Sequence, residues 1–92
     1  MTKTKIYVRM STATAKIVAA QIGDPDIALA MLTSTEHPLR NVELLESEWT
    51  EVLRFLQAKC LEASHHGDIY NVQLYVMLQN DLLRVEDALG ID

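Results

Sequence analysis

The chain has 92 residues, of which 49% are apolar and 23% charged, and its net charge is −5. This length predicts a single domain over residues 1–92, with a modest core and no room for a deep catalytic cleft beside a scaffold. With one Trp, three Tyr and one Phe, the core must be built from aliphatic side chains, which favours helices.

Charge is divided unevenly along the sequence. Residues 1–22 carry four bases and no acid, hence +4, whereas residues 23–92 carry thirteen acids and four bases, hence −9. A basic segment can reach phosphates, while an acidic body suits a basic protein surface. The division therefore predicts a partner of mixed charge, such as a ribonucleoprotein.

Residues 5–10 alternate between apolar and polar side chains, which predicts a short N-terminal strand or extended arm. We expect its polar face and the nearby bases to bind nucleic acid or protein. The residues of this predicted partner-binding surface are Lys3, Lys5, Tyr7, Arg9 and Lys16. The alternative is a strand edge that its lysines protect against aggregation.

Two short helices follow. Serine and threonine at 11–12 cap a helix over residues 13–22, and a glycine ends it. An Asp-Pro pair opens a second helix that reaches about residue 32. Residues 33–38 are polar and end in proline, which predicts a loop.

The strongest periodic pattern covers residues 42–66 and predicts a long amphipathic helix. Its apolar stripe consists of Leu45, Trp49, Val52, Leu53, Leu56, Cys60 and Ala63. Glu43, Glu46 and Glu51 are expected on its outer face or flanks, where they would steer association with a basic protein. Gly67 ends the helix and Asp68 caps the next one, which predicts a tight antiparallel reversal.

Residues 69–89 admit two interpretations. Apolar residues alternate over 69–79 as in a strand, which makes α+β the alternative fold class. Helical spacing fits the whole stretch better, and Val72, Val76 and Leu83 then form a second apolar ridge. This helix should therefore contact neighbours on two sides, either because it is central in the domain or because it is an interface. The predicted fold class is mainly α: a small helical domain with an N-terminal strand or arm and a C-terminal antiparallel helical hairpin.

No catalytic, cofactor or metal site is predicted. Residue types that bind zinc gather at Cys60, Glu62, His65, His66 and Asp68. Helical spacing separates the thiol from the histidines, and Cys60 shares the apolar stripe, which disfavours both a metal site and a nucleophile. Because Cys60 is the only cysteine, an internal disulfide is excluded. No apolar run has the length of a signal peptide or of a membrane span. We therefore expect a cytoplasmic protein.

In its short length, its basic segment from Lys3 to Lys16, its acidic body from Asp24 to Asp92 and its lack of catalytic motifs, the chain resembles the small phage-encoded anti-CRISPR proteins, in particular the type I-F inhibitors. The resemblance implies a non-enzymatic inhibitor in the host bacterial cytoplasm. It implies binding to a multi-subunit surveillance complex, with contact to its guide RNA, and blockage of target DNA binding or hybridisation. It implies no membrane contact and no small-molecule substrate.

The alternative function is a small helical DNA-binding or transcription-regulating module, because the two short helices resemble the start of a helix-turn-helix. The second helix carries Asp26 and no base, which disfavours an approach to phosphates. A thiol- or metal-dependent hydrolase is the third and least favoured function.

Overall fold

The structure, a computed structural model, describes residues 4–32 and 38–91. In these ranges the elements are β1 (Lys5–Ser11), α1 (Thr12–Gln21), α2 (Pro25–Leu32), β2 (Leu39–Leu45), α3 (Glu46–His66) and α4 (Ile69–Leu89). The predicted mainly α fold with an N-terminal strand and a C-terminal helical hairpin is confirmed. Most of the predicted loop over residues 33–38 lies outside the described residues, as does Lys3.

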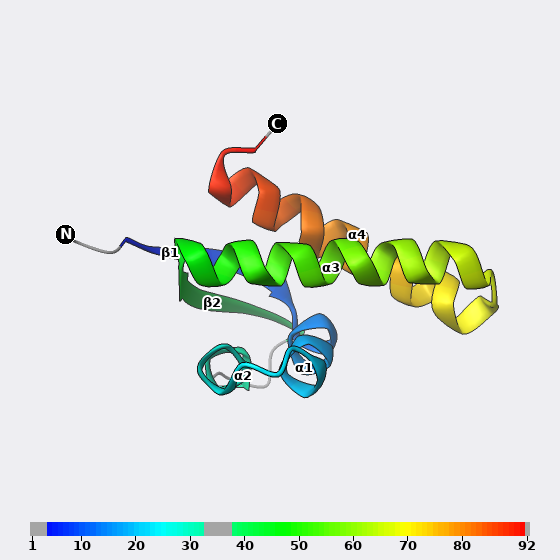
Figure 1. The fold of residues 1–92 in the computed structure, drawn as a ribbon, viewed down its shortest axis with the longest axis horizontal. Helices are drawn as coiled ribbons and strands as arrows, with labels where there is room; N and C mark the ends of the chain where they lie inside the picture. Colours follow the sequence, from blue (N-terminus) through cyan, green and yellow to red (C-terminus); the bar gives the residue numbers. More distant parts are fainter. Residues whose placement is uncertain (1–3, 33–37, 92) are drawn as a thin grey trace.

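The two strands form an antiparallel ribbon in which Lys5 lies opposite Leu45 and Ser11 opposite Leu39. The helices α1 and α2 connect the two strands, so the ribbon is a β-hairpin with two helices inserted in its turn. Figure 1 shows α3 lying across this ribbon, with α4 on one side and α1 and α2 on the other. Helical cover is needed because an isolated two-stranded hairpin is only marginally stable in water.

The predicted helix over residues 42–66 is wrong at its beginning. Residues 39–45 form β2, and α3 starts only at Glu46. The strand was not predicted because its inward positions include a charged residue, Arg40, which breaks the alternation of apolar and polar side chains. Leu45 also stands four residues before Trp49 and so extends the helical stripe backwards.

Arg40 is buried, with 7% of its surface exposed. Its guanidinium donates to the carbonyl of Met31 and, over 3.4 Å, to the hydroxyl of Thr12. A cation is favourable at the C-terminal end of a helix, where carbonyl groups lack helical partners. Arg40 therefore fastens the end of α2 to β2.

Local capping explains the boundaries of α1 and α4. The Ser11 hydroxyl accepts from the Thr14 amide at 3.1 Å and begins α1, whose buried residues are Thr14, Ala15 and Val18. Gly67 adopts φ 65°, in the left-handed region, and the Asp68 carboxylate accepts from the Asn71 amide at 2.7 Å. Because α4 is helical from its first residue, the alternative strand over 69–79 is wrong.

The predicted stripe of α3 forms much of the core, since all its members except Leu45 are buried. Trp49 is fully buried, and its indole N–H donates to the carbonyl of Ile6 at 2.7 Å. This bond satisfies the buried indole and joins α3 to β1.

A buried carboxylate joins β1, α1 and α4. Asp81 is 1% exposed, and it accepts from the Ser11 amide at 3.2 Å and from the Ser11 hydroxyl at 3.0 Å. Arg84 donates to the same carboxylate at 3.2 Å and to the carbonyl of Arg9 at 3.5 Å. Two side chains of α4 thus hold the backbone of β1 at the point where the strand becomes a helix.

We expect Asp81→Ala to lower the free energy of unfolding by about 2 kcal/mol or more, because the half-buried amide and hydroxyl of Ser11 would both lose this acceptor. Urea denaturation measures the change. Asp87→Ala is the matched control, since Asp87 is an exposed carboxylate on the same helix. Equal stability of the two variants would contradict a structural role for Asp81.

Candidate functional site

The outer face of the ribbon carries three of the residues predicted to bind a partner. Lys5, Tyr7 and Arg9 are exposed on β1, and Tyr7 has 67% of its surface accessible. The prediction that these side chains share one exposed face is confirmed. Arg9 lies opposite Asn41 of β2, and Tyr7 lies opposite Glu43.

Glu43 was expected on the outer face of a helix, and that placement is wrong. It belongs to β2, because antiparallel pairing brings residues 39–45 alongside β1. Glu43 therefore lies on the same face as the basic residues of β1, between which Tyr7 stands. The two predicted surfaces, one basic and one acidic, meet here.

Tyr7 and Glu43 are electrostatically coupled. The hydrogen bond from the phenol to the Glu43 carboxylate, followed by the repulsion between that carboxylate and a tyrosinate, raises the pKa of Tyr7 above its ordinary value.

A groove of about 390 Å³ lies between this face and α2. We call it the ribbon groove, and its lining residues are Tyr7, Asp26, Leu29, Ala30, Asn41 and Glu43. It combines two carboxylates with an exposed phenol and an aliphatic wall. An arginine or lysine side chain fits such a lining, because its charge pairs with carboxylates while its stem or guanidinium packs on the ring.

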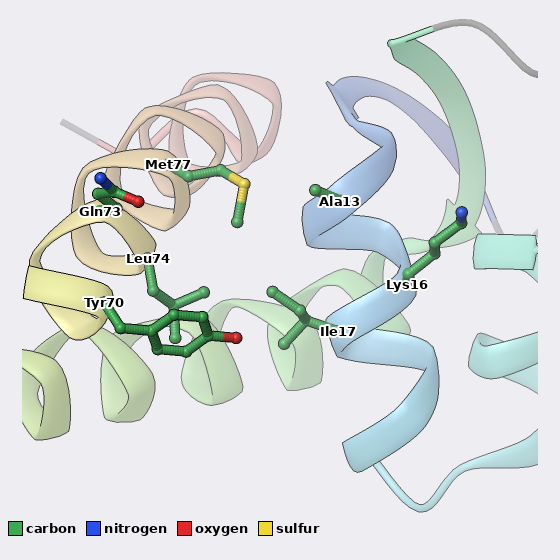
Figure 2. A pocket seen from close by; sticks show the side chains of 7 residues that line it. All are labelled: Ala13, Lys16, Ile17, Tyr70, Gln73, Leu74 and Met77. Carbon is green, nitrogen blue, oxygen red and sulfur yellow. The ribbon is translucent and has the colours of Figure 1, made fainter.

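Lys16 lies apart from the ribbon groove. It stands at the edge of a second groove, of about 410 Å³, between α1 and α4. Figure 2 shows Ile17, Leu74 and Met77 pointing into the space between the two helices, whereas Lys16 extends to the far side of α1. The predicted basic surface is therefore divided between β1 and α1.

The remaining predicted protein-steering residues, Glu46 and Glu51, are exposed on α3 and line neither groove. Glu48, between them, accepts from the Leu45 amide at 3.0 Å and so contributes to the start of α3. Of the three carboxylates predicted to meet a protein, only Glu43 lies in the ribbon groove.

The residues considered for metal binding or catalysis lie apart from one another in the structure. Burial raises the pKa of the Cys60 thiol, while His65 and His66 are exposed at the end of α3. Within residues 4–32 and 38–91, no three histidine, cysteine or acidic side chains come together as a metal site would require. The exposed side of α2 includes Asp26, Leu29 and Leu32, none of which is basic as a DNA-reading helix requires.

Sequence reasoning missed Asp26, Leu29 and Asn41 as members of the ribbon groove. Asp26 reads as an ordinary first-turn carboxylate, because acids stabilise a helix N-terminus wherever it lies. No local signal relates it to Tyr7, nineteen positions earlier; only the packing of α2 beside the ribbon does.

Comparison with protein-family models, with curated proteins and with solved structures found no match for this chain. Among the described residues, no helix has both the length and the hydropathy needed to cross a bilayer. The geometry of the grooves is therefore the basis of the functional proposal.

We expect Glu43→Gln to lower the pKa of Tyr7 toward that of an ordinary tyrosine, because the negative charge that opposes ionisation is removed. The absorbance of tyrosinate measures this during a pH titration, and Tyr7→Phe identifies which of the three tyrosines changes. Glu51→Gln is the matched control and should leave the titration unchanged. An unaltered Tyr7 titration in Glu43→Gln would contradict the coupling.

Proposed function

We propose that this protein is a non-enzymatic inhibitor that binds a bacterial nucleic-acid-processing complex and blocks its binding of target DNA. In its most specific form, the target is a CRISPR-Cas surveillance complex in the host cytoplasm. The observation that carries the proposal is the ribbon groove, in which Glu43 and Asp26 flank an exposed Tyr7.

The groove supports this function because surfaces that bind nucleic acids are lined with arginine and lysine. A carboxylate pair beside an aromatic ring offers such side chains both charge neutralisation and a ring to pack on. A protein that occupies those side chains competes directly with DNA phosphates for them.

Lys5 and Arg9 add a second kind of contact. They lie on the same face as Tyr7, at the two sides of it along β1, and both are exposed. In a ribonucleoprotein they reach phosphates of the guide RNA while the groove holds basic protein side chains. A face of mixed charge suits a partner that presents protein and RNA side by side.

The function is tested with a purified type I-F surveillance complex carrying its guide RNA. We expect the protein to bind the complex and to abolish its binding of target duplex DNA when added in stoichiometric amounts. Free duplex should be bound weakly, whereas a transcription regulator would bind it with a steep dependence on salt. Undiminished target binding by the complex at saturating protein would refute the specific proposal.

The docking surface is tested by charge reversal. Asp26→Lys with Glu43→Lys should weaken binding to the complex by roughly tenfold or more, mainly through faster dissociation. Glu46→Lys with Glu51→Lys is the matched control, because it makes the same change in net charge outside the groove, and it should alter mainly the association rate.

Lys5→Glu with Arg9→Glu should reduce the salt dependence of binding if both contact phosphates. Equal dissociation rates for the two double variants that replace carboxylates with lysine would show that the ribbon groove is not the docking surface.

A further inference from the structure

The hydrogen bonds at one end of the ribbon show which backbone groups point away from it. Directly opposite residues of an antiparallel pair alternate between those that bond to each other and those whose amides and carbonyls point outward. The Thr12 amide donates to the carbonyl of Pro38 at 2.9 Å, so these two residues are a bonded pair. Ser11 and Leu39, the next pair along the ribbon, are therefore of the outward kind. The Ser11 amide accordingly donates to Asp81 and not to β2.

The outward groups in the middle of β2 are open. Asn41 and Glu43 lie two and four residues beyond Leu39, so both direct their amide and carbonyl away from β1. Across residues 4–32 and 38–91, these amides and carbonyls meet no hydrogen-bond partner. A row of unpaired backbone groups at a sheet edge is a template on which another chain can pair.

The outer edge of β1 is different, because side chains of α4 bond to it. The Ser11 amide donates to Asp81, and the Arg9 carbonyl accepts from Arg84 at 3.5 Å. The helix α4 packs beside β1, whereas α2 packs beside β2 (Figure 1). A strand that approached β1 would meet α4, so the edge of β2 is the one open to pairing.

The ribbon groove lies next to this edge of β2. Asn41 and Glu43 line it from the strand, and Asp26, Leu29 and Ala30 line it from α2, so α2 does not fill the space beside the two strand residues. Residues 39–43 span about 13 Å of strand, which accommodates about four residues of an extended chain. The groove thus presents backbone donors and acceptors together with two carboxylates.

We propose that the partner protein docks by adding an extended segment to β2 as a third strand, with a basic residue at every second position. The inference rests on the proposed function and names the part of the partner that the ribbon groove binds. Backbone hydrogen bonds to Asn41 and Glu43 supply affinity, and alternate side chains supply specificity. Because side chains of a strand alternate between the two faces of a sheet, every second residue of the segment lies on the outer face, where arginine or lysine neutralises Glu43 and Asp26.

The charge beside the edge determines which occupant it accepts. A second copy would bring its own Asp26 and Glu43 to the same place, and like charges across paired strands are destabilising. The phosphates of a nucleic acid are repelled by the same carboxylates. A basic, extended segment of protein is the occupant that satisfies both the backbone groups and the carboxylates.

Exchange of backbone amides with solvent tests strand addition directly. The probe is a peptide of seven residues, the length of β2, in which arginine alternates with threonine. At saturating peptide we expect exchange of the Asn41 and Glu43 amides, measured by NMR, to slow by roughly tenfold or more, because each then donates to the added strand. The Tyr7 amide points outward from β1 and is the internal control, whose exchange should not change.

A backbone substitution separates the edge from the side chains. Asn41→Pro removes the outward amide and no bond between β1 and β2, and proline is tolerated at such positions of an edge strand. It should weaken peptide binding, measured by calorimetry, by roughly tenfold or more relative to Asn41→Ala, the matched control that loses the same side chain but keeps the amide. Circular dichroism confirms that both variants are folded. Equal affinities of the two folded variants, unprotected Asn41 and Glu43 amides with peptide bound, or no binding at millimolar peptide would overturn the proposal.

Other occupants and a failure of the proposed function give different results. Protection of the Asn41 and Glu43 amides without peptide, growing with protein concentration, would identify a second copy as the occupant and overturn the proposal. Slowed exchange with peptide, combined with undiminished target binding by the surveillance complex, would count against the proposed function alone. Inhibition of the complex without protection of these two amides in the bound state would count against strand addition alone.

Discussion

The buried carboxylate of Asp81 is the interaction on which the arrangement of the chain depends. It accepts from both the backbone amide and the hydroxyl of Ser11, and that hydroxyl in turn accepts from the Thr14 amide. One serine thus ends a strand, begins a helix and binds a distant helix. Because unpaired buried polar groups are costly, moving α4 away from β1 would require all of these groups to find other partners. The position of α1 relative to α4, and so the groove between them, follows from this junction.

Arg40 plays the corresponding part on the other strand. Its burial is favourable because the end of α2 supplies a carbonyl acceptor, and the resulting contact holds α2 beside the ribbon. That placement creates the ribbon groove, since Asp26, Leu29 and Ala30 become its wall. The buried charge of Arg40 therefore helps to position the exposed carboxylates of Asp26 and Glu43, to which we assign partner binding.

The division of charge along the sequence is only partly a division in space. Antiparallel pairing places Glu43, from the acidic part of the chain, directly opposite Tyr7, from the basic part. The outer face of the ribbon is consequently mixed in charge. By contrast, the stretch of α4 from Ile69 to Asn80 contains no charged residue.

Local hydrogen bonding and helical periodicity can be read from the sequence by itself, because they involve residues within a few positions of one another. Ser11 as a cap, the reversal at Gly67 and Asp68, and the buried stripe from Trp49 to Ala63 were all predictable for this reason. The strand β2 was not, because its inward Arg40 is tolerated only when α2 supplies an acceptor. The meeting of Asp26 and Glu43 at Tyr7 likewise required the assembled ribbon and helix. Tertiary structure decided these features because each depends on a partner remote in sequence, and no periodic pattern records which remote groups will meet.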